Sequence, residues 1–403
     1  MVNPKKVTLR SNKNEATIYQ GCCLDSLRHL PSGSVHCCVT SPPYWGLRDY
    51  GREEQIGLEE TPEAYVAKMV AFFREVRRVL REDGTLWLNL GDSYASSGVH
   101  GGAGDSAQVG NTISGCQGRA PTPLGLKAKD LVGIPWRVAF ALQADGWFLR
   151  QDLIWAKPNP MPESVTDRCT KSHEYVFLLT KRSRYFFDAE AIKEESVDPE
   201  SIEGRRKRHS RKDNATAFAP GGMSFASERS GFLKGKANDE GRQYLQRNRR
   251  SVWSISTKPY TGAHFATMPV DLVEPCILAG TSAEGCCAKC GNPLIRILEK
   301  ERTATRPGTN SKFEEEDEFI QYGGKTLRER HLVTSQTVGY ERSCECNAAT
   351  VPCVVLDPFS GSGTTLAVAA KLERNGIGCE LNSDYIRLAI DRIGREIEQS
   401  RLF

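Results

Sequence analysis

The sequence of 403 residues predicts an α/β fold built on a mostly parallel sheet, with ligand-binding turns at the carboxyl ends of its strands. Three observations support this prediction. Residues 34–39 are rich in small and β-branched residues, and two prolines soon end the expected strand because proline has no N–H to donate. Residues 353–357 are apolar and run into a Gly-x-Gly turn and a helix-like segment. Residues 64–80 carry apolar side chains at helical spacing, as expected of a helix that covers a sheet.

The composition is that of an ordinary globular protein, with 39% hydrophobic and 26% charged residues. No apolar run approaches the roughly 18 residues of a membrane span, and residues 1–6 lack a signal-peptide core. We therefore expect a cytoplasmic protein without a membrane partner, long enough for two or three domains. The 14 cysteines are no evidence of disulfides in that compartment, and the net charge of +4 is too small to identify a partner.

The expected elements follow in chain order. Strands are predicted near 16–20, 35–40, 85–90, 148–155, 353–357 and 376–380, and helices at 24–30, 64–80, 135–144, 270–278 and 366–372. Asp83-Gly84 is expected to end the long helix. Two regions interrupt this pattern, a Gly- and Ser-rich loop at 98–125 and a segment near 190–251 with basic runs at 205–212 and 247–250.

The first candidate site is the turn Ser41-Pro42-Pro43-Tyr44, directly after the expected strand at 35–40. A hydroxyl, rigid carbonyls and an aromatic ring together suit a flat, amino-bearing substrate such as a nucleobase. The oxygens accept hydrogen bonds from an exocyclic NH2 group while the ring stacks on the base. The alternative is a proline turn that only caps the strand.

The second candidate site is the glycine turn that contains Gly361 and Gly363, where a strand meets a helix N-terminus. A phosphate-binding P-loop is disfavoured because no Gly-Lys-Ser/Thr is present. Glu380 ends the next expected strand, about 20 residues after the turn, where an acid binds ribose hydroxyls. A ligand with a ribose but no phosphate contact fits S-adenosylmethionine better than a dinucleotide.

The chain resembles the amino-group DNA methyltransferases in two motifs, Ser-Pro-Pro-Tyr at 41–44 and Asp-Pro-Phe-x-Gly-Ser-Gly-Thr-Thr at 357–365. The order of these motifs resembles the beta class of that family. The resemblance covers most of the chain and is weakest near 191–255. It implies a circularly permuted Rossmann-like fold that is dependent on S-adenosylmethionine. It also implies double-stranded DNA as the partner, and a restriction endonuclease acting on the same site can accompany such an enzyme.

The resemblance assigns roles to particular residues. Serine at 41 resembles the cytosine-N4 subgroup, whereas Asp or Asn is usual for adenine-N6, which is the alternative. The family usually has an acid after Gly21, where this sequence has Cys22. Phe265 would contact the cofactor, although 262–269 is also compatible with a simple helix-entry turn. The implied site residues are Ser41, Pro42, Pro43 and Tyr44 for catalysis, and Asp357, Phe359, Gly361, Gly363, Thr364, Glu380 and Phe265 for the cofactor.

The implied reaction is transfer of a methyl group from S-adenosylmethionine to the exocyclic amino group of a flipped base, in a site-specific DNA methyltransferase. Ser41 Oγ and the Pro42 carbonyl would accept the amino protons and expose the nitrogen lone pair, without a metal or a covalent intermediate. Two other possibilities remain open. One is a non-catalytic zinc-dependent DNA-binding protein on a methyltransferase scaffold, and the other is a methyltransferase acting on RNA or on a protein glutamine.

Two close cysteine pairs predict a structural zinc site formed by Cys287, Cys290, Cys344 and Cys346. The first pair has the knuckle form Cys-x-x-Cys-Gly, and four thiolates leave no open position on a tetrahedral zinc. A redox Cys-x-x-Cys is disfavoured because no thioredoxin-like context surrounds it. Cys286 is an alternative to Cys287, but the spacing favours Cys287.

These features divide the chain into four parts. Residues 1–190 form the catalytic half of the methyltransferase domain, 191–260 a basic variable insert for target recognition, 261–285 with 347–403 the cofactor-binding half, and 286–346 a zinc-ribbon-like insert. The loop at 98–125 is either a linker or a segment that closes over DNA. Lys157, Arg168 and Lys171 are candidate phosphate contacts, and His173-Glu174 is expected to be structural or to position DNA.

Overall fold

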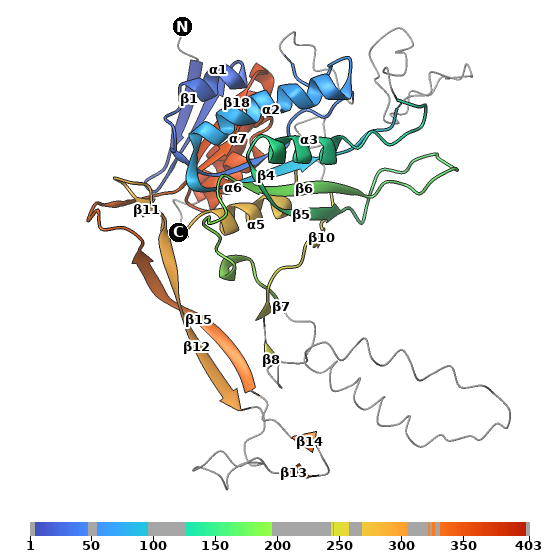
Figure 1. Cartoon of the computed structure of the whole chain (residues 1–403). Helices are drawn as coiled ribbons and strands as arrows, with labels where there is room; N and C mark the ends of the chain where they lie inside the picture. Colours follow the sequence, from blue (N-terminus) through green and yellow to red (C-terminus); the bar gives the residue numbers. More distant parts are fainter. Residues whose placement is uncertain are drawn as a thin grey trace, which may run out of the picture. The chain divides into compact units, whose positions relative to one another are not determined.

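The computed structural model describes residues 5–46, 55–95, 126–195, 243–244, 246–257, 268–304, 321–322, 325–326 and 331–399 (Figure 1). Three parts of the sequence analysis fall outside these residues: the loop at 98–125, the basic run at 205–212, and Phe265. No helix among the described residues is long and apolar enough to cross a membrane.

The first half of the chain supplies most of the main sheet. Its elements are β1 (Lys5–Arg10), β2 (Glu15–Gln20), α1 (Cys23–Arg28), β3 (Val35–Thr40), α2 (Pro62–Val79), β4 (Leu80–Leu90), α3 (Ile134–Ala144), β5 (Phe148–Ala156), β6 (His173–Thr180), a 3-10 turn at Glu190–Ile192 and β7 (Glu194–Glu195).

The described part of the second half contains strands of 2 to 12 residues and three helices. Its elements are β8 (Gln243–Tyr244), β9 (Gln246–Arg247), β10 (Val252–Ser254), α5 (Val270–Gly280), β11 (Cys286–Cys287), β12 (Leu294–Ala304), β13 (Gln321–Tyr322), β14 (Lys325–Thr326), β15 (His331–Arg342), β16 (Thr350–Val351), β17 (Val354–Asp357), α6 (Thr364–Lys371), β18 (Asn375–Glu380) and α7 (Ser383–Gln399).

The main sheet has nine strands in the order β1-β2-β18-β17-β3-β4-β6-β5-β10. The five strands from β2 to β4 run parallel, whereas β1 and β6 are antiparallel to their neighbours. β17, from the C-terminal end of the chain, pairs with β3, from the N-terminal end, in the register Val355↔Cys37 and Leu356↔Cys38. The carboxyl ends of β3 and β17 therefore lie side by side, and so do the two predicted turns that follow them.

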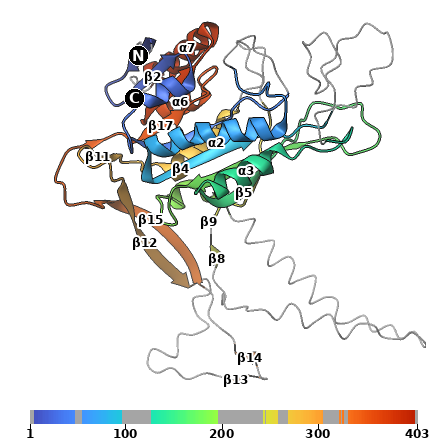
Figure 2. The ribbon, with the colours of Figure 1, turned by 45° about the horizontal axis from the view of Figure 1, so that its top comes forward.

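Alternate residues of the strands enter different cores, which places helices on both faces of the sheet. Leu86 and Leu88 of β4 pack in one buried cluster with α2 and α3. Trp87, between them, packs in a second cluster with α5. Figures 1 and 2 show α2 and α3 on the opposite face of the sheet from α5. A third cluster joins α6 and α7 to β2.

The long helix α2 begins as the sequence predicts and ends earlier. Thr61 caps its first turn by accepting a hydrogen bond from the Ala64 N–H at 3.1 Å, with Pro62 in the first turn. The prediction that Asp83-Gly84 ends the helix is wrong, because β4 already starts at Leu80. A Cβ on Gly84 would lie 2.7 Å from the Leu80 side chain, so Gly84 serves close packing within this strand.

Several strands carry too little pattern to be predicted. β1 and β10 extend the two edges of the main sheet, and the paired strands β12 and β15 lie within the residues predicted to form the zinc-ribbon-like insert. The predicted strands at 16–20, 35–40, 148–155, 353–357 and 376–380 are all present within one residue of their expected ends.

The described chain divides into two compact units. The first contains 1–192, 250–295 and 340–403, and so holds both predicted turns and all four cysteines of the expected zinc site. The second contains 193–249 and 296–339. In this second unit β15 pairs with β12 and with β8.

Candidate active site and cysteine cluster

The proline turn follows β3 directly. It is held by hydrogen bonds to α2 and to the segment that precedes α2. The Pro43 carbonyl accepts a hydrogen bond from the Tyr65 hydroxyl at 2.9 Å. The buried Trp45 donates from Nε1 to the Glu59 carbonyl at 2.8 Å. These contacts hold residues 41–44 in one conformation at the carboxyl end of the strand, where α/β sheets bind ligands.

Tyr44 lies at the centre of a polar network that the sequence analysis does not foresee. Ser41 Oγ donates to the Tyr44 hydroxyl at 3.1 Å, and that hydroxyl donates to Glu174 Oε2 at 2.8 Å. Asn89, at the end of β4, brings its Oδ1 to 3.1 Å from the same hydroxyl and donates from Nδ2 to Glu174 Oε2 at 3.1 Å. Side chains from three neighbouring strands of the sheet, or from the turns that follow them, thus meet at one tyrosine.

Glu174 is a member of the site, and Lys157 neutralises it. The Lys157 ammonium forms an ion pair with Glu174 Oε1, and only 19% and 16% of the two side chains are exposed. The same ammonium lies 4.3 Å from the centre of the Trp155 ring. The sequence predicts a structural or DNA-positioning role for Glu174, and in the structure its carboxylate contacts Tyr44 of the predicted catalytic turn. It predicts a phosphate contact for Lys157, which here holds Glu174.

The environment of Tyr44 keeps its hydroxyl protonated. Burial, followed by the charge of Glu174, raises the pKa of Tyr44 well above its usual value. The ring edge lies against Gly91, where an added Cβ would come within 2.6 Å of Tyr44 Cε2. Tyr44 is therefore neutral and donates a hydrogen bond to Glu174. Gly91 lies against its ring edge, and the polar network binds its hydroxyl.

The shape of the glycine turn between β17 and α6 depends on its backbone conformation. Gly361 and Gly363 have φ values of 49° and 77°, in the left-handed region that glycine tolerates best. A Cβ on Gly363 would also lie 2.7 Å from the Ala389 Cβ of α7. Glu380 closes the turn, since its two carboxylate oxygens accept from the N–H groups of Gly361 and Asn382 at 2.8 Å each. Burial raises the pKa of Glu380.

Asp357 joins the two turns. Its Oδ1 accepts from the hydroxyl of Thr40, the residue before Ser41, at 2.7 Å, and from the Phe359 N–H at 3.1 Å. The residue is only 2% exposed, and burial raises the pKa of Asp357 to about 6. Asp357 is thus placed beneath the turn, between β17 and β3, where it fixes their relative position.

The other predicted cofactor residues lie in or beside the glycine turn and make different contacts. Phe359 packs its ring 4.7 Å from that of Phe72 of α2. Thr364 is buried and accepts a hydrogen bond from Arg392 at 2.6 Å. Ser362 Oγ is buried and has no hydrogen-bond partner among the described residues. Phe265 lies outside the described residues.

Cys22 is the N-cap residue of α1, two residues after the end of β2. The Gly21 N–H donates to the Glu380 carbonyl at 3.0 Å, so the residue that replaces the usual acid is at the edge of the glycine-turn site. Contact with the neighbouring Cys23 thiol lowers the pKa of Cys22 to about 6. Cys22 therefore stands at the position where the resemblance implies an acid, with its thiol in contact with that of Cys23.

The four cysteines predicted to bind zinc come together. The Sγ atoms of Cys287, Cys290, Cys344 and Cys346 all lie within 4.8 Å of one another. Hydrogen bonds from the backbone N–H groups of Cys290 and Lys289 lower the pKa of Cys287 to about 6. N–H groups directed at the first sulfur of a Cys-x-x-Cys turn suit a thiolate ligand. Cys286, the alternative to Cys287, is instead directed at the carbonyls of Val351 and Pro352.

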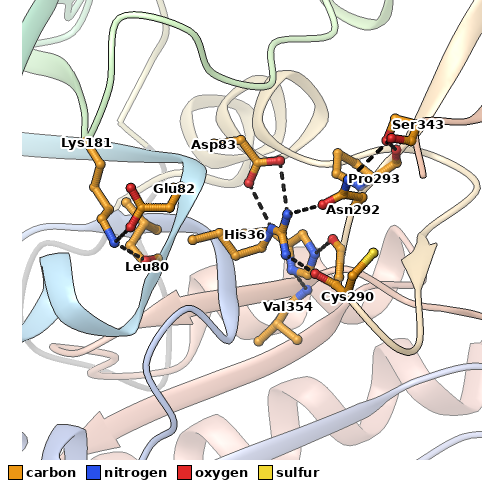
Figure 3. A network of polar contacts seen from close by, with 12 residues as sticks. His36, Leu80, Glu82, Asp83, Lys181, Cys290, Asn292, Pro293, Ser343 and Val354 are labelled. Carbon is orange, nitrogen blue, oxygen red and sulfur yellow. Dashed lines mark hydrogen bonds and ion pairs between the residues drawn. The ribbon is translucent and has the colours of Figure 1, made fainter. Parts of the chain in front are cut away.

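A polar network attaches this cysteine cluster to the main sheet (Figure 3). Arg81 of β4 donates to the Cys290 carbonyl at 2.6 Å and to Asn292 Oδ1 at 2.9 Å, while its Nε binds Asp83 at 2.8 Å. His36 of β3 links the Gly291 carbonyl, 2.8 Å from Nε2, to the Val354 N–H, 3.0 Å from Nδ1. Since the Val354 N–H occupies Nδ1, the proton of this imidazole is on Nε2.

Lys171 and Arg168, two of the residues predicted to contact phosphate, bind other residues of the protein. Lys171 donates to the Asp92 carbonyl at 2.8 Å. Arg168 pairs with Glu163 at 2.6 Å and lies 4.0 Å from the Tyr94 ring centre. The Asp92 carboxylate accepts from the N–H groups of Gly133 and Ile134, both at 2.9 Å, and so caps α3.

A mixed α/β sheet with a proline turn and a glycine turn on adjacent strands defines the class of Rossmann-like methyltransferases. The sequence matches the DNA methylase family model over residues 35–288 and 353–391. It is 39% identical to type II methyltransferase M.Cfr9I of Citrobacter freundii, over 95% of this chain and 89% of the relative. It is 38% identical to type II methyltransferase M.SmaI of Serratia marcescens, over 96% and 94%. The chain therefore belongs to the N6/N4 DNA methylase family.

The fold of this family is also found in a solved structure. The PvuII DNA methyltransferase, described as cytosine-N4-specific, aligns with a TM-score of 0.51 at 16% identity, over 98% of this chain and 96% of that one. At this identity the likeness concerns the fold alone.

Proposed function

We propose that the protein is a site-specific DNA methyltransferase that transfers a methyl group from S-adenosylmethionine to N4 of a flipped cytosine. The observation that carries the proposal is the hydrogen bond between Thr40 and Asp357 at 2.7 Å. It joins the residue before Ser41 to the last residue of the cofactor strand. An amino acceptor and a methyl donor that occupy these two turns would lie within reach of each other, which is the main requirement of an in-line transfer.

The choice of cytosine over adenine rests on Ser41. Serine at this position resembles the cytosine-N4 subgroup, whereas Asp or Asn is usual for adenine-N6. Adenine N6 is the alternative, because it carries the same exocyclic amino group and the same chemistry would serve it. The two relatives named type II methyltransferases support DNA as the substrate. We extend to this chain the role in a restriction–modification system, with an endonuclease acting on the same site.

The residues of the glycine turn fit S-adenosylmethionine. Gly361 and Gly363 let the backbone come close to a ligand at the N-terminus of α6. Ser362 supplies a buried hydroxyl that lacks a partner among the described residues. Glu380 accepts hydrogen bonds from the backbone N–H groups of Gly361, Leu381 and Asn382, and a carboxylate with about four lone-pair sites keeps acceptor capacity for a ribose hydroxyl. The bound cofactor would supply an electrophilic methyl group.

The chain's own residues would orient and activate the base. Ser41 Oγ and the Pro42 carbonyl accept the amino protons, which raises electron density on the nitrogen. Tyr44 presents a ring held between Gly91 and the polar network, on which a flipped base can stack. The order of the motifs, with β17 inserted between β18 and β3, supports the interpretation of the sheet as a circular permutation.

The test is transfer of a tritiated methyl group to duplex DNA of varied sequence, with the product base identified by mass spectrometry. Wild type should yield N4-methylcytosine. Ser41→Ala should keep the affinity for S-adenosylmethionine but slow transfer by about 2–4 kcal/mol of activation free energy, by analogy with loss of one transition-state hydrogen bond. N6-methyladenine would overturn the choice of base. No methylated base at all would favour a non-catalytic DNA-binding protein.

We also propose that the cysteine cluster holds one structural zinc ion in the insert at 286–346. The four Sγ atoms within 4.8 Å of one another support this proposal, since four cysteine sulfurs this close can ligate one tetrahedral zinc. The purified protein should contain about one equivalent of zinc, and Cys290→Ser should lose it. Cys169→Ser, at an exposed cysteine remote in sequence from the cluster, is the matched control and should retain the metal. A zinc-free wild-type protein with full activity would refute the site.

A further inference from the structure

The hydrogen bonds from Ser41 to Glu174 all point in one direction. Ser41 Oγ donates to the Tyr44 hydroxyl at 3.1 Å, and Tyr44 in turn donates to Glu174 Oε2 at 2.8 Å. A hydroxyl carries a single proton, so Ser41 has only lone pairs left for a substrate. The direction of the chain therefore makes Ser41 an acceptor towards the base rather than a donor.

The direction of the chain is imposed by its last member. Glu174 has no proton to donate when ionised, and the Lys157 ammonium at Oε1 stabilises the ionised form. Asn89 donates from Nδ2 to Glu174 Oε2 and to the Tyr175 carbonyl, both at 3.1 Å, so the orientation of its amide is fixed. With Nδ2 thus committed, Asn89 presents its Oδ1 to the Tyr44 hydroxyl at 3.1 Å, and Glu174 Oε2 is the nearer of the two acceptors of the Tyr44 proton, at 2.8 Å.

Methyl transfer to an amino group creates a proton that must leave. When the nitrogen lone pair forms the new N–C bond, the S–C bond breaks and its electron pair stays on sulfur. The nitrogen then carries one proton too many. The described part of the site contains one continuous line of protonated oxygens that leads from the nitrogen position to a carboxylate, and this is the line from Ser41 through Tyr44 to Glu174.

We propose that this line is a proton relay and that Glu174 is its terminal acceptor. The nitrogen gives its proton to Ser41 Oγ, the Ser41 proton passes to the Tyr44 oxygen, and the Tyr44 proton passes to Glu174 Oε2. Both hydroxyls end with one proton each, and Glu174 ends as a neutral carboxylic acid that returns the proton to water. The inference rests on the proposed function, since it needs an exocyclic amine at Ser41, but it holds equally for cytosine and adenine.

The raised pKa of Tyr44 agrees with a relay in which no tyrosinate accumulates. A proton that enters the hydroxyl from Ser41 must leave it towards Glu174 in the same event. Glu174 contacts no reacting atom, so it is a positioning residue that acts through Tyr44. The competing explanation is that Glu174 only fixes the orientation of Tyr44, as an amide would also do.

Two substitutions separate these explanations because they predict opposite rankings. Glu174→Gln keeps the length of the side chain and an oxygen that accepts from Tyr44, but this oxygen cannot take up a proton at neutral pH. Glu174→Asp keeps the carboxylate and shortens the side chain by one methylene. A relay predicts that the Asp variant is faster than the Gln variant, whereas a purely orienting role predicts the reverse.

The experiment measures single-turnover transfer of a tritiated methyl group to duplex DNA that wild type methylates, in H2O and in D2O. Glu174→Gln should be slower on the order of 10²-fold, the size typical of a lost proton acceptor. Tyr44→Phe keeps the ring and breaks the relay, so it should be similarly slow and should show a smaller solvent isotope effect than wild type. Combining it with Glu174→Gln should add little, because both act on one path.

Matched controls keep the outcomes distinct. Glu75→Gln neutralises the carboxylate of another half-buried ion pair, with Arg78 of α2, and should transfer at the wild-type rate. Calorimetry should show unchanged affinity for S-adenosylmethionine in every variant. If Glu174→Gln does not fold, Tyr44→Phe carries the test alone. A Gln variant as fast as the Asp variant, or Tyr44→Phe at the wild-type rate, overturns the relay; an inactive wild type overturns the proposed function instead.

Discussion

The two turns that meet at the centre of the sheet are held in different ways. The glycine turn after β17 is fixed by backbone conformation, with Gly361 and Gly363 at positive φ and Glu380 bound to backbone N–H groups. The proline turn after β3 is fixed by side chains, among them Tyr65 and Glu174, which come from other elements. In the proposed function the first would be a rigid receptor for S-adenosylmethionine, which is the same in every cycle. The second would be a polar network that passes protons from Ser41 to Glu174.

Asp357 makes the two turns one site. Its buried carboxylate receives hydrogen bonds from Thr40 on the proline side and from Phe359 on the glycine side. The contact is costly, because burial raises the pKa of Asp357 to about 6. A stability cost at such a position is typical of functional sites, where geometry is maintained at the expense of stability.

The largest effect is expected from a change in the glycine turn. Gly363→Ala introduces a Cβ at φ 77°, and this Cβ would lie 2.7 Å from the Ala389 Cβ. Left-handed backbone costs about 1–2 kcal/mol for a residue with a side chain, and overpacking adds about 1–3 kcal/mol. We therefore expect the free energy of unfolding in urea to fall by about 2–5 kcal/mol, and the affinity for S-adenosylmethionine to fall with it.

Gly394→Ala provides the control for this change. Gly394 lies in α7, as does Ala389, but a Cβ added to it would meet no atom within 4 Å, and its φ is not positive. Alanine there should be neutral or stabilising by about 0.5–1 kcal/mol, as in other helix interiors. Equal stability of the two alanine variants would show that the turn is not the rigid receptor described above.

A substitution at Asp357 is expected to raise the free energy of unfolding, in contrast to the loss at Gly363. The folded-state pKa of about 6 exceeds the ordinary value of 3.8, so ionisation destabilises the folded state above about pH 6, and stability is regained as the pH falls from there towards 4. Asp357→Asn removes the buried charge and keeps an Oδ1 for both Thr40 and Phe359. At pH 8 it should raise the free energy of unfolding by about 2–3 kcal/mol.

Urea unfolding of wild type and Asp357→Asn between pH 8 and pH 4 measures this difference. The gain should shrink below about pH 6 and be small at pH 4, because the wild-type carboxyl is then neutral in the folded state and only about half ionised in the unfolded state. A constant gain across this range would mean that a contact other than the charge is responsible.

The same contrast explains what can be predicted from the sequence. The glycine turn is identified with its glycines and Glu380, because all its determinants lie within about 20 residues of one another. The proline turn is identified as a motif, but the sequence does not place Asn89, Lys157 and Glu174 around Tyr44. Only the pairing of β4, β5 and β6 brings them there, over separations of 45 and 130 residues from Tyr44 to Asn89 and Glu174. The only hint in the sequence is that Asn89 and Glu174 are polar residues at the ends of two apolar strands, β4 and β6.

The paired strands β12 and β15 show a second limit to prediction from the sequence. Leu294–Ala304 and His331–Arg342 contain many charged and polar residues, so no hydrophobic alternation distinguishes them from a loop. The early end of α2 shows a third, because Asp83-Gly84 has the composition of a helix stop but lies inside β4. Arg81 and Asp83 pair within that strand, and Arg81 also reaches Cys290 and Asn292, which no local pattern predicts.

The smallest effect is expected from a substitution beside the proline turn. Gly91 follows β4, and a Cβ added to it would lie 2.6 Å from Tyr44 Cε2, so Gly91→Ala must displace the tyrosine ring. Overpacking of this kind costs about 1–3 kcal/mol, and a ring held by hydrogen bonds at its far end cannot absorb it freely. The displacement should stretch the contacts of the Tyr44 hydroxyl with Ser41 and Glu174. Methyl transfer should therefore slow by about tenfold or more, since 1.4 kcal/mol corresponds to a factor of ten, while calorimetric affinity for S-adenosylmethionine stays unchanged. Loss of cofactor affinity instead of rate would show that the two turns are not held independently, and that the side-chain network also supports the glycine turn.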